Sequence, residues 1–290
     1  MSISIKDQIL GCLLGGALGD SIGAKFENQS ASHYSIPDTL NITDDTQLTL
    51  ATCEAIIERG RVEPESIARQ MAIWYRKRKI SGIGSSTLKA LTELDAGAHW
   101  ATAGATGERS AGNGAAMRIS PVAFFLNPDD LSDRRTLKDV ANVTHRNDEA
   151  YLGALAVTYA IRAIQCKRDL IEMLIEKLPD SNIRDRFVEI RQFQLTPESL
   201  AKRYQPTGYV VDSVPFSILA AVESVNLMET FEMIVSCGGD TDTTASMCGN
   251  LVGAEKGPSV IPMEIASRID AYDSIFDVAE KLAQHTNLPE

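Results

Sequence analysis

Residues 11–24 read Gly-Cys-Leu-Leu-Gly-Gly-Ala-Leu-Gly-Asp-Ser-Ile-Gly-Ala, and glycine occupies every fourth position from 11 to 23. In a helix this spacing collects the glycines on one face, although each interior glycine costs about 1 kcal/mol relative to alanine. A second stripe of small residues, Ala245, Gly249 and Gly253, repeats the spacing near the other end of the chain. The two stripes predict two helices that cross in close contact in the middle of the fold.

The rest of the chain also favours helices, because apolar residues recur with a helical period and strand alternation is missing. Helices are expected over residues 47–60, 66–79, 151–164, 214–225, 229–237, 243–254 and 275–285, with surface loops at 127–135, 179–185 and 205–209. No Gly/Ser linker, fixed-period repeat or low-complexity tract divides the sequence. The sequence therefore predicts an all-α protein with one compact domain over residues 1–290. Two lobes separated by a cleft are the alternative.

Composition and charge argue against several classes of function. The 290 residues include 28 lysines and arginines against 39 acids, and the formal net charge of −11 disfavours an extended nucleic-acid surface. The apolar run over residues 9–18 is shorter than the roughly 20 residues that span a bilayer, so no membrane association is expected. Five cysteines without a CxxC pair favour a reduced, cytoplasmic location over a disulfide framework or a zinc knuckle. GxSxG and GxxxxGK motifs are absent, which disfavours a serine hydrolase or a nucleoside triphosphatase.

Two acidic clusters each precede a predicted helix. The first is Thr43-Asp-Asp-Thr46, and the second is Gly238-Gly-Asp-Thr-Asp-Thr-Thr244. Helix capping explains one acid per helix, but it gives no role to the second acid or to the hydroxyls. Mg²⁺ and Mn²⁺ prefer oxygen ligands, whereas no Cys or His stands in either cluster for zinc. The clusters therefore predict two Mg²⁺ or Mn²⁺ ions, with Asp240 and Asp242 converging from a non-helical lead-in and Thr243 filling a further position.

A third segment favours an anion site. In Ser110-Ala-Gly-Asn-Gly-Ala-Ala-Met-Arg118 the Asn-Gly pair is not flanked by alternating strands, so a hairpin is disfavoured. The glycines free the backbone to point N–H groups at a pyrophosphate, and a helix expected to follow would add its positive end. Arg118 either supplies charge or pairs with an acid inside the fold. His145 either orients a substrate hydroxyl or ring, or is an ordinary loop histidine.

Five motifs, taken together and in this order, resemble the ADP-ribosylglycohydrolase family, of the dinitrogenase-reductase-activating glycohydrolase and ADP-ribosyl-acceptor hydrolase type. They are the glycine-rich residues 15–23 with Glu27, the 43–46 cluster, residues 112–118, Thr144-His145, and residues 238–243, and they span residues 11–257. The resemblance implies an all-α, orthogonal multi-helix domain with a binuclear Mg²⁺ or Mn²⁺ centre in a central cleft. It also implies a hydrolase that frees ADP-ribose from a protein arginine or serine, or from a small molecule such as O-acetyl-ADP-ribose. A monomer is expected.

The resemblance assigns roles to individual residues of this chain. The metal ligands would be Thr43, Asp44, Asp45, Asp240, Asp242 and Thr243, with Asp242 as the bridge. The catalytic carboxylates would be Glu27, Asp44, Asp45 and Asp242. The ADP-ribose moiety would be held by Ser110, Ala111, Gly112, Asn113 and Gly114 at the diphosphate and by His145 at the ribose. In this arrangement the ions fix the ribose hydroxyls and polarise a water, while a carboxylate moves the proton.

One position departs from the family pattern. The arginine-specific bacterial branch commonly has an aspartate in an Asp-Ile-Gly segment, whereas this chain reads Ser81-Gly-Ile-Gly-Ser-Ser-Thr87 and has Gly82 in its place. Serine-linked or O-acetyl-linked ADP-ribose therefore competes with arginine-linked ADP-ribose as the substrate. The alternative to such an enzyme is a non-catalytic or immunity-type relative that binds ADP-ribose and protects against an ADP-ribosylating toxin.

Overall fold

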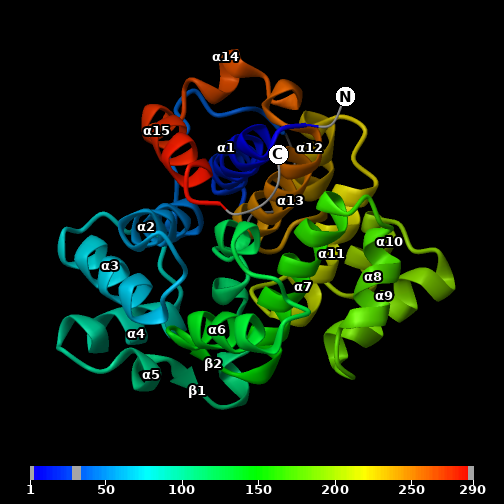
Figure 1. The fold of residues 1–290 in the computed structure, drawn as a ribbon. Coiled ribbons are helices and arrows are strands. Elements are labelled where there is room, and N and C mark those ends of the chain that lie inside the picture. The colour runs from blue at the N-terminus through cyan, green and yellow to red at the C-terminus, as the bar shows by residue number, and fades with distance from the viewer. Residues whose placement is uncertain (1–2, 28–33, 287–290) are drawn as a thin grey trace.

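The computed structural model describes residues 3–27 and 34–286, and helices make up most of this part (Figure 1). The α-helices are α1 Ile5–Gly23, α2 Asp44–Arg59, α3 Pro64–Arg76, α4 Ser85–Asp95, α5 Trp100–Ala103, α6 Leu131–Asn142, α7 Asp148–Gln165, α8 Leu170–Lys177, α9 Asn182–Phe193, α10 Pro197–Arg203, α11 Val210–Val222, α12 Leu227–Cys237, α13 Thr241–Lys256, α14 Met263–Ala266 and α15 Tyr272–Ala283. The 3₁₀ turns are η1 Glu108–Ser110, η2 Asn113–Ala115, η3 Ser120–Phe124 and η4 Pro258–Val260, and the strands β1 Ala105–Thr106 and β2 His145–Arg146 pair in parallel. The expected all-α fold is confirmed. Among the described helices, none has both the length and the apolar character needed to cross a membrane.

Helices α1 and α13 form the centre of the fold, where they run antiparallel in direct contact (Figure 1). A Cβ atom on Gly11 would lie 2.2 Å from the carbonyl oxygen of Gly253, and one on Gly249 would lie 2.1 Å from that of Gly15. Only glycine allows two backbones to approach this closely, so the helix crossing predicted from the two stripes is confirmed. Helices α2, α12 and α15 also pack against α1, which is buried without interruption from Gly11 to its end.

The antiparallel arrangement brings the C-terminal end of α1 to the N-terminal end of α13. The hydroxyl of Thr241 donates a hydrogen bond of 2.8 Å to the carbonyl oxygen of Gly23. A Cβ atom on Gly23 would lie 2.6 Å from the Cα atom of Asp242. The segment that follows α1 therefore begins beside the acidic residues at the start of α13.

The structure also contains helices that the periodicity does not predict, namely α4, α5, α6, α8, α9, α10 and α14. The loops expected at 127–135 and 179–185 are present over 127–130 and 179–181, but the predictions are wrong beyond these residues, because α6 begins at Leu131 and α9 begins at Asn182. The polar residues that suggested loops are N-caps: the side chain of Asp130 accepts a 2.8 Å hydrogen bond from the N–H of Ser132, and Ser181 caps α9 in the same way. These helices bury few residues, so their apolar pattern is weak.

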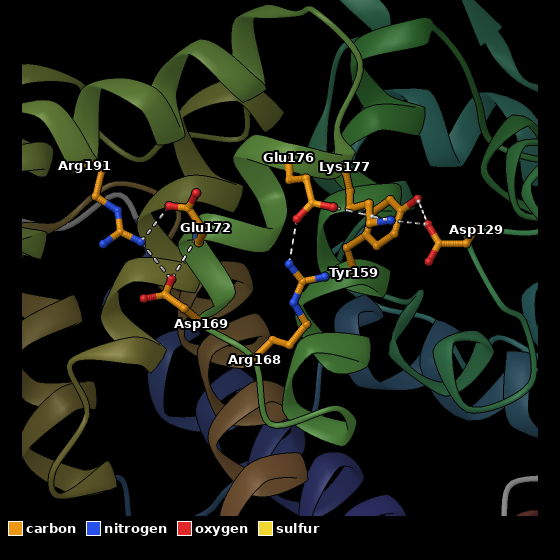
Figure 2. A network of polar contacts seen from close by, with 8 residues as sticks. All are labelled: Asp129, Tyr159, Arg168, Asp169, Glu172, Glu176, Lys177 and Arg191. Atoms are coloured by element: carbon orange, nitrogen blue, oxygen red, sulfur yellow. Dashed lines mark hydrogen bonds and ion pairs between the residues drawn. The ribbon is translucent and has the colours of Figure 1, made fainter.

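The outer helices α8 and α9 are joined at the surface by ion pairs (Figure 2). Arg191 on α9 lies 3.0 Å from Asp169 and 3.3 Å from Glu172 at the start of α8. Arg168, in the turn before α8, pairs with Glu176 at 2.6 Å. Because these side chains stay largely in water, such pairs contribute little to stability. The buried apolar residues beneath them hold this layer to the core.

Candidate active site

A cleft of about 310 Å³ lies where the starts of α2 and α13 meet the segment after α1. Its lining residues are Glu27, Asp44, Asp45, Gly82, Gly84, Ser85, Ser86, Thr87, Arg109, Gly112, Asn113, Gly114, Met117, His145, Gly208, Asp240, Asp242 and Thr243. The fold thus gathers most of the site residues expected from the sequence in one place. Thr43, Ser110 and Ala111 do not line this cleft.

Helix α2 contributes two buried carboxylates from its first turn. The Oδ2 atom of Asp45 accepts a hydrogen bond of 3.1 Å from the Thr243 hydroxyl on α13, so the two acidic helix starts touch. The Oδ1 atom of Asp45 is buried and has no hydrogen-bond partner among the described residues. Asp44 precedes it, and its backbone N–H donates to the carbonyl oxygen of Ser81 at 2.9 Å. A buried carboxylate oxygen without a donor suits a cation as its partner.

The start of α13 and the segment after α1 contribute three more carboxylates. Oxygen atoms of Glu27, Asp240 and Asp242 lie within 4.8 Å of one another, a spacing that fits a metal ion. Asp240 is the N-cap of α13 and Asp242 lies in its first turn, so the expected non-helical lead-in is wrong for Asp242. The N-cap and the first turn thus place both side chains at one end of α13. The side chain of Asn113 fixes Asp240, because its Nδ2 donates a 2.8 Å hydrogen bond to Oδ2.

Asp20, which the sequence did not single out as a site residue, holds the two acidic helix starts together. This fully buried carboxylate on α1 accepts hydrogen bonds from the N–H and the hydroxyl of Thr43, at 3.0 and 2.7 Å. It accepts two more from the N–H and hydroxyl of Thr46, at 3.1 and 2.6 Å. Asp20 therefore caps α2 from another helix. The signal in the sequence is an acid that interrupts the apolar and small residues of α1 beyond Gln8.

The clustered carboxylates raise one another's pKa values. Burial and the charge of Asp20 raise the pKa of Asp44 to about 8. Burial and a hydrogen bond to Asp240 raise the pKa of Asp242 to about 9. For Asp45, burial and the charge of Asp242 raise the pKa well above its usual range. Such a cluster needs either bound protons or cations, because water is largely excluded from it.

We expect the metal-free protein to lose stability as pH rises. A carboxyl group with a raised pKa binds its proton more tightly in the folded chain, so unfolding releases protons and its free energy falls with pH. For Asp44 and Asp242 the window runs from about 3.8, the ordinary pKa, to about 8 and about 9. Between about pH 5 and pH 9 the free energy of unfolding of the chelated protein should fall by several kcal/mol, since each such group contributes up to about 1.4 kcal/mol per pH unit.

Urea unfolding of chelator-treated protein across that range measures the pH dependence. An excess of Mg²⁺ or Mn²⁺ should remove the decline, and Asp242→Asn should make it shallower. Stability of the chelated protein that increases with pH would contradict the raised pKa values.

Residues 110–114 form a glycine loop opposite the acids. This glycine loop is attached to the segment between α10 and α11, where the loop expected at 205–209 is confirmed. The N–H of Asn113 donates to the carbonyl oxygen of Gly208 at 3.0 Å, so it is not free for an anion. The N–H of Gly112, which precedes η2, meets no acceptor in the described part of the chain. This N–H group remains available to an anion. Ser110 instead donates its hydroxyl to Thr106 at 2.8 Å.

The His145 ring packs against Gly112 and Gly114 of this glycine loop. A Cβ atom on Gly112 would lie 3.1 Å from its Nε2, and one on Gly114 would lie 2.7 Å from its Cε1. Its Nδ1 lies 2.8 Å from the Thr144 hydroxyl. Burial and the nearby charge of Arg118 lower the pKa of His145 to about 3. The ring is therefore neutral at physiological pH, and it lines the cleft.

Arg118 lies behind the loop rather than in the cleft. It is fully buried, and its guanidinium donates to the carbonyl oxygens of Gly114 and Val140, the latter at 3.2 Å. Burial lowers the pKa of Arg118 to about 10, so it stays charged. The prediction of a helix after the glycine loop is wrong, because the 3₁₀ turns η2 and η3 occupy this stretch. Arg118 thus connects turn η2 to helix α6 through the carbonyl oxygens of Gly114 and Val140.

Neutral residues form the wall next to Asp44. Gly82 has a φ of +80°, and a Cβ atom there would lie 3.3 Å from Oδ1 of Asp44. An aspartate at this position would strain the backbone and bring a sixth negative charge to the acidic lining. The neighbouring residues that line the cleft are Gly84, Ser85, Ser86 and Thr87.

The described residues thus form an all-α fold in which carboxylates at helix starts face a glycine loop across a cleft. The sequence profile of the ADP-ribosylglycohydrolase family matches residues 1–290. The chain belongs to this family, and it is a hydrolase of glycosidic bonds to ADP-ribose.

Similarity to known proteins extends along the whole chain. ADP-ribosyl-[dinitrogen reductase] glycohydrolase of Rhodospirillum rubrum is 26% identical and covers 92% of each chain. ADP-ribosylarginine hydrolase Tri1 of Pseudomonas putida is 24% identical and covers 95% of this chain and 78% of its own. A solved structure described as an ADP-ribosylglycohydrolase-related protein complex aligns with a TM-score of 0.74 over 97% of this chain and 98% of its own, at 22% identity. At this identity, the last match shows a shared fold only.

Proposed function

We propose that this protein releases ADP-ribose from an acceptor in the described cleft with the help of two divalent cations, Mg²⁺ or Mn²⁺. The ligands would be Thr43, Asp44, Asp45, Asp240, Asp242 and Thr243. The observation that carries this proposal is the buried Oδ1 of Asp45, which lacks a donor while its Oδ2 accepts the Thr243 hydroxyl from the opposite helix. Carboxylate and hydroxyl oxygens are the donors that these hard cations prefer.

The cations, when bound, would supply Lewis acidity for the ribose hydroxyls and the attacking water. Glu27 at the mouth of the cleft is suited to take a proton from a water, because its carboxylate is exposed beside Asp240 and Asp242. The acidic lining would stabilise the positive charge that develops at C1″ as the bond to the acceptor breaks. Asn113 would keep Asp240 aligned through its hydrogen bond.

The neutral residues around Gly82 affect which acceptor group the cleft prefers. A guanidinium acceptor is best held by a carboxylate at hydrogen-bonding distance, and in this chain Gly82 replaces the acid of the arginine-specific pattern. Ser85 and Thr87 offer hydroxyl groups instead. We therefore propose that serine-linked or O-acetyl-linked ADP-ribose is hydrolysed faster than arginine-linked ADP-ribose, although the relative named ADP-ribosylarginine hydrolase keeps arginine as the competing acceptor.

A panel of three substrates tests both the acceptor and the cation. Release of ADP-ribose from serine-linked, O-acetyl-linked and arginine-linked substrates is measured with Mg²⁺, with Mn²⁺ and with a chelator. We expect activity with either cation, a loss of at least about 100-fold with the chelator, and higher kcat/KM for the oxygen-linked substrates.

Two results would contradict these expectations. Full activity in chelator would overturn the cation-dependent mechanism, and faster hydrolysis of the arginine-linked substrate would overturn the inference from Gly82. Tight binding of ADP-ribose without any turnover would instead support a binding or immunity role.

A further inference from the structure

Arg109 is the single cation that lines the cleft within residues 3–27 and 34–286. The other charged lining residues are the acids Glu27, Asp44, Asp45, Asp240 and Asp242. Arg118 carries charge nearby, but it lies behind the glycine loop and does not line the cleft. A diphosphate that enters this acidic cleft therefore meets one positive side chain.

The guanidinium of Arg109 is available to a ligand. Its side chain is exposed, and it makes no hydrogen bond, ion pair or ring contact with any residue that the structure describes. By contrast, Arg186 on α9 pairs with Glu189 and Asp212. An unpaired guanidinium presents five N–H donors in a planar fork, and this geometry matches two phosphate oxygens.

The backbone around Arg109 is anchored next to the glycine loop. In turn η1 the N–H of Ser110 donates to the carbonyl oxygen of Gly107 at 3.0 Å, and Asn147 Nδ2 donates to the same oxygen at 3.1 Å. The open N–H of Gly112 follows shortly after in the chain. One fixed segment thus carries both a free cation and a backbone donor, a combination that suits a phosphate group.

We propose that Arg109 binds the diphosphate of ADP-ribose at the mouth of the cleft and selects substrates that carry a diphosphate. This inference rests on the proposed function, because it requires ADP-ribose to occupy this cleft. The contact offsets the repulsion between the diphosphate and the acidic lining. Its loss weakens binding more than chemistry, so KM rises while kcat changes little.

Calorimetric titration tests this role with ADP-ribose and with ribose 5-phosphate at two salt concentrations. The proteins are the wild type, R109Q, R109K and R135Q, all with Mg²⁺. R109Q should bind ADP-ribose about tenfold or more weakly, as expected for a lost charge-assisted hydrogen bond, and with a smaller salt dependence. R109K should recover part of the affinity, because it restores the charge without the fork.

R135Q is the matched control, because Arg135 is an exposed arginine on α6 that does not line the cleft. It should bind ADP-ribose like the wild type, and the thermal unfolding midpoint of R109Q should not change. Equal ADP-ribose affinities of R109Q and wild type would overturn the role of Arg109 and leave the hydrolysis standing. An equal loss for ribose 5-phosphate would overturn diphosphate selection. Wild type that binds no ADP-ribose would overturn the proposed function and this inference together.

Discussion

Asp242→Asn is expected to lower ADP-ribose release by at least about 1,000-fold at saturating Mg²⁺ or Mn²⁺, because it removes the proposed bridging charge. The side chain lies in the first turn of α13, and its carboxylate shares a 4.8 Å cluster with those of Glu27 and Asp240. Asparagine keeps the size of the side chain, so the backbone N–H of Thr243 retains an acceptor in place of Oδ1. Initial rates of ADP-ribose release, measured over a range of cation concentrations, give the loss.

The fold of this variant should survive. Asp242 must bind a proton to be neutral in the metal-free cluster, whereas asparagine is neutral without one, so the unfolding midpoint in chelator should equal or exceed that of the wild type. Asp273→Asn is the matched control, since Asp273 also lies in the first turn of a helix, α15, but is exposed and outside the cleft. Wild-type turnover by Asp242→Asn would exclude Asp242 from the mechanism, and equal losses in both variants would point to a general effect of lost charge.

Local spacing predicted the parts of the site that depend on short stretches of sequence. The acids of residues 43–46 and 238–244 stand at helix starts, and hydroxyls accompany them within a few positions. Their pairing across the cleft followed from shared chemistry, and the hydrogen bond between Asp45 and Thr243 agrees with it. The glycine stripes could also be predicted from local sequence, because an i, i+4 repeat lies within a single helix.

Contacts between residues far apart in the sequence could not be predicted in the same way. Asp20 gains its role only from Thr43 and Thr46, which lie 23 and 26 residues further along the chain. The N–H of Asn113 is taken by Gly208, on a loop that no local pattern connects to it. A single acid or a single amide gives no periodic signal. Such roles follow from the packing of helices, which the sequence defines only through its whole pattern of burial.

Gly249→Ala is expected to cause a large loss of stability for a single methyl addition at the centre of the fold. The new Cβ atom would lie 2.1 Å from the carbonyl oxygen of Gly15 and 2.6 Å from its carbonyl carbon. These are backbone atoms of a buried helix, so no side-chain rotation can relieve the contact and α1 must move away from α13. Overpacking a core costs about 1–3 kcal/mol in general, and we expect a loss of at least about 3 kcal/mol here, measured by urea unfolding.

The same movement should also reduce activity, because α13 carries Asp242 and the segment after α1 carries Glu27. Gly84→Ala is the matched control for stability: Gly84 has an ordinary φ of −65°, and no atom lies within 4 Å of an added Cβ. This control should unfold within about 1 kcal/mol of the wild type, since it adds a methyl group without a clash. If Gly249→Ala unfolds at the same urea concentration as Gly84→Ala, the two central helices do not touch through their backbones. A large loss confined to Gly249→Ala would show that this contact sets both the core and the position of the acidic cluster.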